Sequence, residues 1–458
     1  MPRSLAFLFL LSLVLSLSLS LPAKIAKAQP AAPSQVIQRI DLYKGEWKGA
    51  MVAKRLRSMV EEHTAFGIAP LTESRLSQVS LPSLNQQPDQ ILTSAQTTVE
   101  LQNRFGNKYE LIPKALVDLA SLGKQTAIIS SIILKNRTVI LVTLPNGEKK
   151  TTWIDINSKN FRQLINEYRI GLERFRDYDY DTRLAQQLYN WMIRPFAADL
   201  EAREIKTLVF IQDGILRSVP MAALHDGEKF LVQKYAIATT PSLTHINSKN
   251  TIRKRQALVL GLTKQATVDG RKFPALTNVE KEISQIQAQI PGSKQLLDED
   301  FTRDRLQLEL SKTVYPIIHI ATHGEFGTNP TDTYLVTGNN DKLTITDLST
   351  TIRSIKSTDA VELLFLTACQ TAVGDDRAIL GLAGVAVGAG VRSAIATLWF
   401  IQDAPTVTLV TEFYKHWYKL GMSKAQALQA SQQALIEAGG QYTHPAYWAS
   451  FILIGNWQ

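Results

Sequence analysis

"AVELLFLTAC", residues 360–369, leads a run of apolar side chains directly into Cys369, the single cysteine among 458 residues. An apolar run of this length is typical of a strand that is buried on both faces, as in a parallel sheet with helices on each side. "PIIHIATHGEF", residues 316–326, has the same character and leads into His323 and Gly324. Together the two stretches predict core strands that end in chemically reactive residues.

Strands and helices alternate on either side of these stretches, after two β-rich runs at 127–134 and 138–144. Further strands are expected at 207–212, 235–240, 257–262, 393–399 and 451–455, and helices at 158–176, 181–200, 379–391, 404–419 and 423–438. Two more helices are expected, one after Thr302 and one after a capping box that begins at Thr277. This alternation predicts an α/β fold with a mostly parallel sheet flanked by helices.

The composition is that of an ordinary globular protein, with 45% hydrophobic and 20% charged residues. The formal net charge is +9, and it falls to +6 when the three cations of residues 1–28 are left out. The densest basic runs, "KRLR" (54–57) and "RKR" (253–255), are short and far apart. They indicate a solvated surface rather than a nucleic-acid interface.

The first 28 residues have the pattern of a secretory signal. An apolar run from Leu5 to Leu21 follows a basic start, and the small-x-small sequence at 26–28 would be cleaved before Gln29. An uncleaved membrane anchor is the alternative, because the run is close to the length of a short membrane span. We expect a secreted or periplasmic mature protein without stable membrane contact.

Composition divides the chain into four parts. Residues 1–28 form the signal peptide, and residues 29–110 form a polar, partly helical segment with a linker rich in Ser, Gln and Pro. Strands and helices then make up a first half, 111–250, and a second half, 251–458. The sequence has no internal repeat of the tetratricopeptide type.

Two of the predicted strands end in residues that suit nucleophilic catalysis. If the strands are neighbours in a parallel sheet, His323 and Cys369 emerge at the same edge, where the imidazole can take the thiol proton. The backbone N–H groups of Gly324 and Cys369 could then stabilise an oxyanion. A free cysteine also packs as a small apolar residue, so Cys369 alone does not establish reactivity.

Other candidates have simpler explanations. His319 lies four residues before His323 and could share a metal with it, but no third ligand accompanies the pair, which favours a buried, hydrogen-bonded histidine. Asp375 and Asp376 follow Cys369 in a loop and are candidate substrate-binding residues, although paired aspartates in loops are usually only solvated. Three tryptophans are expected in the core: Trp399, Trp448 and Trp457.

Several ordered segments resemble the CHAT domain, a caspase-like cysteine peptidase domain often found with tetratricopeptide repeats in bacteria. They are "HIATHGEF" (319–326), the stretch from "LLFLTACQTA" to "SAIATLW" (363–399) and "HPAYWASFILIGNW" (444–457). The upstream segment 208–243 is similar to the amino-terminal half of the same domain. The resemblance runs from about residue 110 to the end and is nearest to the cyanobacterial type.

The resemblance implies a caspase–haemoglobinase fold, as in separases and gingipains, with an inactive first half and an active second half. It makes His323 the general base and Cys369 the nucleophile, and it implies no cofactor. "LWFIQD" (398–403) is similar to a pattern in which the last aspartate, here Asp403, binds a substrate arginine. Asp403 also precedes Ala404-Pro405 and so has the pattern of a helix N-cap.

Two functions remain open at this stage. The first is a cysteine endopeptidase that acts on a protein or peptide, with cleavage after a basic residue. The second is a catalytically silent CHAT-fold interaction or scaffolding protein. The paired thiol and imidazole favour the enzyme, whereas an oxidising compartment counts against an exposed thiolate.

Overall fold

The computed structural model describes residues 123–173, 180–240, 256–325, 333–355, 361–368, 389–399 and 403–458. All of them belong to one compact unit, Ser83–Gln458. The predicted signal peptide, the segment 29–110, the basic runs and residues 379–388 of the helix expected at 379–391 lie outside the described residues, and residues 389–391 are not helical. Within the described part no helix is long and apolar enough to cross a lipid bilayer.

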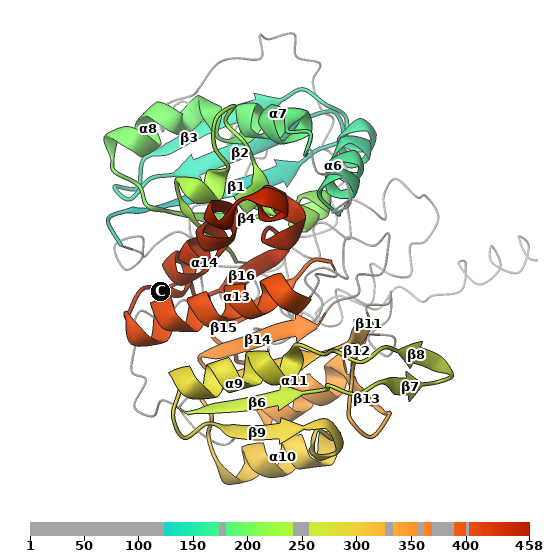
Figure 1. Cartoon of the computed structure of the whole chain (residues 1–458). Helices are drawn as coiled ribbons and strands as arrows, with labels where there is room; N and C mark the ends of the chain where they lie inside the picture. Colours follow the sequence, from blue (N-terminus) through green and yellow to red (C-terminus); the bar gives the residue numbers. More distant parts are fainter. Residues whose placement is uncertain are drawn as a thin grey trace, which may run out of the picture. The chain divides into compact units, whose positions relative to one another are not determined.

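An eleven-stranded sheet runs through the described part in the order β3-β2-β1-β4-β5-β16-β15-β14-β10-β6-β9 (Figure 1). Its first-half strands are β1 (Thr126–Ile133), β2 (Thr138–Thr143), β3 (Lys149–Ile154), β4 (Thr207–Ile211) and β5 (Ala236–Thr239). Its second-half strands are β6 (Ala257–Gly261), β9 (Lys294–Leu297), β10 (Ile317–Thr322), β14 (Leu363–Ala368), β15 (Ser393–Thr397) and β16 (Phe451–Gly455). The last strand of the chain, β16, lies between the two halves and pairs with both β5 and β15.

The second half is parallel from β9 through β6, β10 and β14 to β15, and β16 runs antiparallel to β15. In the first half, β1 pairs in parallel with β4 and β4 with β5, whereas β1, β2 and β3 form antiparallel hairpins. The prediction of a mostly parallel α/β sheet is therefore confirmed. The apolar strands are buried on both faces, as their lack of alternating polar residues indicates.

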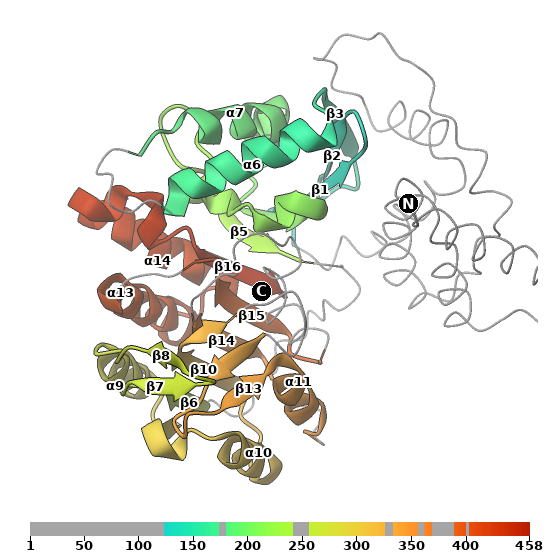
Figure 2. The same ribbon diagram turned by 90° about the vertical axis from the view of Figure 1, so that its right-hand side faces the viewer.

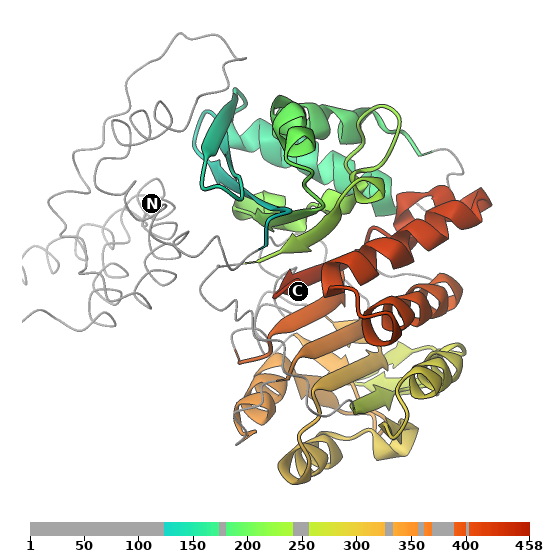
Figure 3. The same cartoon turned by 90° about the vertical axis from the view of Figure 1, so that its left-hand side faces the viewer.

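Helices cover both faces of this sheet. Those packed on the first half are α6 (Ser158–Glu173), α7 (Arg183–Met192) and α8 (Ala197–Ala202). Those on the second half are α9 (Val279–Gln289), α10 (Arg303–Lys312), α11 (Ile345–Arg353), α13 (Asp403–Tyr414) and α14 (Lys424–Ala438). Seen nearly edge-on in Figure 2, α9, α13 and α14 lie on one face and α11 on the other, and Figure 3 shows this division from the opposite side.

Side chains alternate between the two faces along each strand, and two large hydrophobic clusters result. Ile317 and Phe365 belong to the cluster that contains residues of α9, α13 and α14. Ile318 and Leu364, each one position away from these residues, belong to the cluster that contains residues of α10 and α11. The three tryptophans predicted in the core are at most 3% exposed, which confirms that prediction.

Two small sheets lie beside the main one and were not predicted. A hairpin joins β7 (Ala266–Val268) to β8 (Arg271–Phe273), and a three-stranded sheet contains β11 (Gly324–Glu325), β12 (Tyr334–Val336) and β13 (Lys342–Thr344). In Figure 1 the hairpin extends to the right of the main sheet. Apolar residues of the hairpin and of β12 form a third, smaller hydrophobic cluster.

Helix starts confirm one sequence prediction and overturn another. The Thr302 side chain accepts a hydrogen bond from the Arg305 N–H at the start of α10, as expected of an N-cap. The capping box predicted from Thr277 is wrong, because α9 begins one residue later, with Asn278 at the N-cap and no side-chain capping bond. The chain at Asn278 has helical rather than extended backbone angles, which places its side chain out of reach of the first turn.

Candidate functional site

The strands that carry the two predicted catalytic positions are direct neighbours. β10 and β14 pair in parallel, with Thr322 opposite Ala368 as the last registered pair. His323 is the next residue after β10, and Cys369 is the next residue after β14. Cys369 itself lies outside the described residues, as do Asp375 and Asp376.

The imidazole of His323 is buried at this edge, with 7% of the residue exposed. Its Nε2 atom lies 2.7 Å from the backbone oxygen of Pro274. Because a carbonyl oxygen can only accept, Nε2 carries the proton and donates this bond. In the neutral ring the lone pair is therefore on Nδ1, the form that a general base needs. The Phe273 ring packs against the imidazole at a centroid distance of 5.3 Å.

The hairpin that supplies Phe273 and Pro274 is tied to the small three-stranded sheet. Arg271 forms an ion pair with Glu325, two residues after His323, and Lys342 forms one with Asp269. The side-chain oxygen of Asn340 accepts a hydrogen bond from the Thr267 N–H at 2.7 Å. These contacts fix the position of the carbonyl that orients His323.

The backbone beside His323 is held by β12. The Val336 N–H donates to the His323 oxygen at 2.9 Å, and the Thr322 hydroxyl donates to the Val336 oxygen at 2.7 Å. Gly324 is paired with Leu335 in the antiparallel ladder. A bond from Val336 to His323 makes Gly324 and Leu335 a non-hydrogen-bonded pair, so the Gly324 N–H points away from β12. The predicted oxyanion donor is thus directed to the side of β11 that faces away from β12.

His319 is the centre of a buried polar cluster beneath the strand ends. His319 is fully buried, at 0% exposed. Its Nε2 atom donates a hydrogen bond to the Glu282 carboxylate at 2.8 Å, and its Nδ1 atom lies 3.3 Å from the Tyr414 hydroxyl. The Thr367 hydroxyl donates to the same Glu282 oxygen at 2.9 Å. The interpretation of His319 as a buried, hydrogen-bonded histidine is confirmed.

The tyrosine of this cluster keeps its proton. Burial, and after it the charge of Glu282, raises the pKa of Tyr414 well above its usual value. The hydroxyl therefore stays a neutral hydrogen-bonding group beside Nδ1 of His319, while Nε2 donates to the Glu282 carboxylate. Within the described residues no group of three or more His, Cys, Asp or Glu side chains is arranged to hold a metal ion.

The end of β14 is also held from its other side. The Thr397 hydroxyl, at the end of β15, donates to the Ala368 oxygen at 3.2 Å. Asp403 is the first residue of α13, the helix that follows β15 along the chain. The structure describes its backbone but not its side chain. Of the predicted site residues, the structure therefore describes His323 and Gly324 in full and only the backbone of Asp403.

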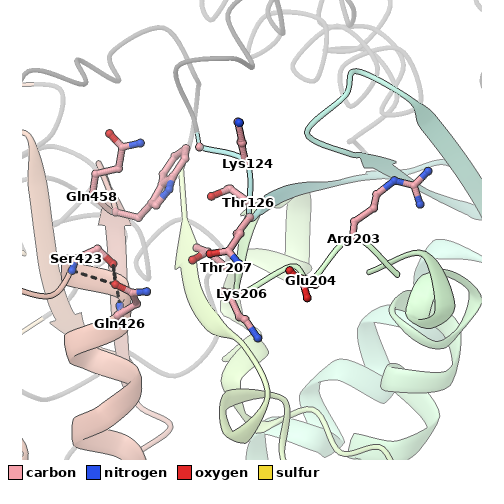
Figure 4. A pocket seen from close by; sticks show the side chains of 12 residues that line it. Lys124, Thr126, Arg203, Glu204, Lys206, Thr207, Ser423, Gln426 and Gln458 are labelled. Atoms are coloured by element: carbon pink, nitrogen blue, oxygen red, sulfur yellow. Dashed lines mark hydrogen bonds between the residues drawn. The ribbon is translucent and has the colours of Figure 1, made fainter. Parts of the chain in front are cut away.

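A cavity of about 570 Å³ lies away from this region, where β1 and β4 begin. Figure 4 shows Ser423, Gln426 and Gln458 on one side of it and Lys124 and Arg203 on the other. Arg203 is already paired with Glu148 and Asp199. Neither His323 nor Gly324 lines this cavity.

The model of the CHAT domain family matches residues 182–456 of the chain. The match covers more than half of the 458 residues, so the chain belongs to the CHAT domain family. The family predicted from the sequence is therefore confirmed.

Curated relatives and solved structures match at low identity. Human tetratricopeptide repeat protein 28 is 21% identical over 323 residues, which cover 59% of this chain and only 13% of the human protein, and the mouse protein is 22% identical. The Saccharomyces cerevisiae separase–securin complex matches with a TM-score of 0.46 at 13% identity, over 78% of this chain and 32% of that one. The Arg-specific cysteine proteinase gingipain R matches with a TM-score of 0.39 at 10% identity, over 65% of this chain and 74% of that one. A complex of the pro- and mature domains of Porphyromonas gingivalis RgpB also matches.

Sequence reasoning missed three residues that shape this site: Phe273, Pro274 and Glu282. The "DG" dipeptide at 269–270 is a hairpin signal, and both residues have positive φ angles, of 49° and 79°. It could have predicted the β7–β8 hairpin. The contact of Pro274 with His323 joins residues 49 positions apart and carries no local signal.

Proposed function

We propose that this chain is a secreted or periplasmic cysteine endopeptidase that hydrolyses peptide bonds through Cys369 and His323, after a basic residue. The register of β10 and β14 carries the proposal. Thr322 and Ala368 are partners, so the next residues, His323 and Cys369, follow neighbouring strands at the same edge. Neighbouring strands lie about 4.8 Å apart, which is within the reach of a thiol and an imidazole.

The alternation of side chains supports the same pairing. Phe365 and Thr367 face α9 and α13, since one lies in their cluster and the other bonds to Glu282. If the alternation continued for two more residues, the Cys369 side chain would face the same way. His323 continues the alternation of Ile317, His319 and Ala321 on β10 in the same way.

The chemistry follows from the orientation of His323. Nδ1 takes the thiol proton, and the thiolate attacks the substrate carbonyl to form a carbon–sulfur bond. The N–H groups of Gly324 and Cys369 stabilise the resulting oxyanion. The imidazolium then returns the proton to the leaving amine, and water activated by His323 hydrolyses the acyl-enzyme and frees the thiol.

Substrate selection is assigned to Asp403, with Asp375 and Asp376 as further substrate-binding residues. Asp403 begins α13 directly after the segment that follows β15, the neighbour of β14. A carboxylate there would pair with the guanidinium of a substrate arginine through charge-assisted hydrogen bonds. The same side chain can cap α13, and the two roles do not exclude each other.

A peptidyl-arginine chloromethylketone tests the function directly. We expect the mature protein to gain the mass of one probe at Cys369, and the Cys369→Ala variant to gain none. A matched probe with aspartate in place of arginine should label far more slowly. Absence of labelling by either probe, with slow alkylation by iodoacetamide, would instead support the scaffolding function.

The compartment needs a separate experiment. Expression in a bacterial host, with fractionation and amino-terminal sequencing, should yield a mature protein that begins at Gln29 outside the plasma membrane. A protein that stays in the membrane fraction with residues 1–28 intact would support the uncleaved anchor.

A further inference from the structure

We propose that Glu282 is a positioning residue that links β10 to β14 and so keeps His323 and Cys369 opposite each other. The inference rests on the proposed function and concerns a residue outside the reacting groups. It comes from the buried polar cluster of Glu282, His319, Thr367 and Tyr414, which the catalytic steps above do not use.

One carboxylate oxygen of Glu282 joins the two strands. It accepts from Nε2 of His319, on β10, at 2.8 Å and from the hydroxyl of Thr367, on β14, at 2.9 Å. Glu282 is 3% exposed, so water does not compete for these bonds. The sliding of one strand past the other by a residue would break at least one of these bonds.

The two partners lie close to the positions that the proposal concerns. His319 is four residues before His323, and Thr367 is two residues before Cys369. At about 3.3 Å per residue along a strand, the links lie roughly 7 to 13 Å from the reacting groups. They are near enough to set the register of the strand ends and too far to contact a substrate.

The cluster also joins the strands to the two helices that cover this face. Glu282 comes from α9 and Tyr414 from α13, and the Tyr414 hydroxyl lies 3.3 Å from Nδ1 of His319. α13 is the helix that begins at Asp403. A single network therefore connects both strand ends with the element to which substrate selection is assigned.

A purely structural requirement at this place would be met by apolar side chains. The surrounding positions on this face, such as Ile317, Ile283 and Phe365, are apolar and buried. Burying a carboxylate is costly, and apolar replacements of buried ionic groups are often neutral or stabilising. What the polar cluster adds is a directional link between two particular strands.

A second buried ionic cluster provides a matched control at the opposite end of β14. Glu362, one residue before β14, is 3% exposed and pairs with Lys424 at 2.6 Å and with Arg392 at 3.3 Å. Loss of this carboxylate should cost stability as loss of Glu282 does. It should not alter the strand ends at His323.

The test is the pH profile of iodoacetamide alkylation, which reports only on Cys369 because the chain has no other cysteine. We expect Thr367→Val to slow alkylation near neutral pH by about tenfold and to move the profile to higher pH, because small misplacements of reacting groups have large effects. Glu282→Gln should act in the same direction. Thr367→Ser restores the hydroxyl and should stay within about twofold of wild type.

Melting temperatures measured on the same samples separate positioning from stability. Glu362→Gln should lower the melting temperature and leave the alkylation profile unchanged. A wild-type profile in Thr367→Val would overturn the positioning role, as would an equal change in Thr367→Ser or Glu362→Gln. His323→Ala is measured alongside. If His323→Ala leaves alkylation unchanged, the proposed function itself fails. If His323→Ala slows alkylation but Thr367→Val does not, only the positioning role of Glu282 fails.

Discussion

The two halves of the sheet use their strand ends differently. In the first half, β4 is followed by Gln212, whose side-chain N–H groups donate to the oxygens of Leu216 and Val219 and whose Oε1 accepts from Thr239. In the second half, β10 is followed by His323, which donates to Pro274 through Nε2. The amide of Gln212 is thus used in holding its own loop, while the imidazole has a second nitrogen suited to proton transfer.

The next residue of the first half reinforces this contrast. The Asp213 carboxylate accepts from the Ile133 N–H at 3.0 Å, and the Asp213 N–H donates to the Ser131 hydroxyl at 3.1 Å. Both bonds close the ends of β1 and β4 onto each other. The carboxyl ends of parallel strands meet at one edge of the sheet in both halves. Whether that edge forms a reactive site depends on the residues that follow the strands.

The largest expected effect is that of Cys369→Ala on peptide cleavage. Turnover should disappear, because no other thiol in the chain can replace the nucleophile. The free energy of unfolding should change by only about 1 kcal/mol, since one sulfur atom is removed. Cleavage and thermal melting of the two proteins measure both quantities, and residual cleavage by the alanine variant would exclude Cys369.

The second prediction compares substitutions of the residues that follow β10 and β4. His323→Ala should slow peptide cleavage and Cys369 alkylation near neutral pH, because an unassisted thiol is only about a few per cent ionised there. Gln212→Ala, the equivalent change after β4, should lower the melting temperature without changing either rate. Equal rates in His323→Ala and wild type would remove the functional difference between the halves.

A smaller effect is expected for substrate selection. Asp403→Ala should lose the preference for Arg or Lys before the cleaved bond, by about 2 kcal/mol in transition-state binding. A positional-scanning peptide library measures the preference, and Asp403→Asn tests the charge while keeping a residue that can cap α13. If the asparagine variant retains the basic preference, Asp403 is only a helix cap.

The smallest effect concerns a carboxylate of the first half. Burial alone would raise the pKa of Asp226, but Lys234 and the N–H groups of Lys229 and Glu228 outweigh it and lower the pKa to about 2. Since the folded pKa lies below the usual 3.8, the stabilisation is present above pH 4 and is lost as the pH falls towards 2. Because the partner Lys234 is 42% exposed and water screens the ion pair, we expect less than about 1 kcal/mol.

Urea unfolding of wild type and Asp226→Asn measures this contribution. The variant should be slightly less stable at pH 6 and equal to wild type near pH 2. A stability difference that grows as the pH falls would contradict the assigned direction. Cleavage activity at pH 6 should be the same in both proteins, because Asp226 serves the fold of the first half.

Local sequence patterns predicted the elements whose structure depends on the residues within them, such as the buried strands. The apolar runs that became β10 and β14 lack polar alternation, and buried parallel strands require that pattern. The predicted neighbourhood of the two strands is confirmed by the pairing of Thr322 with Ala368. Cys369, Asp375, Asp376 and the side chain of Asp403 lie outside the described residues and remain predictions.

The missed parts depend on contacts between distant segments. Glu282 and Thr367 are 85 residues apart, and nothing near either residue indicates the other. The capping box at Thr277 failed because a four-residue pattern does not fix the backbone angles at the helix start. Sequence patterns therefore predicted neighbouring strand ends for His323 and Cys369 but not the groups that contact His323 and His319.

The ultraviolet titration of the single thiol tests the pairing of Cys369 with His323 most directly. The ultraviolet absorbance change that is lost in Cys369→Ala reports only the Cys369 thiolate, because the subtraction removes the contribution of the 13 tyrosines, and its midpoint can be compared between wild type and His323→Ala. The account predicts a wild-type midpoint below the usual value of about 8.5, and a midpoint at or above that value in His323→Ala. The same midpoint in both proteins, at about 8.5 or higher, would contradict it.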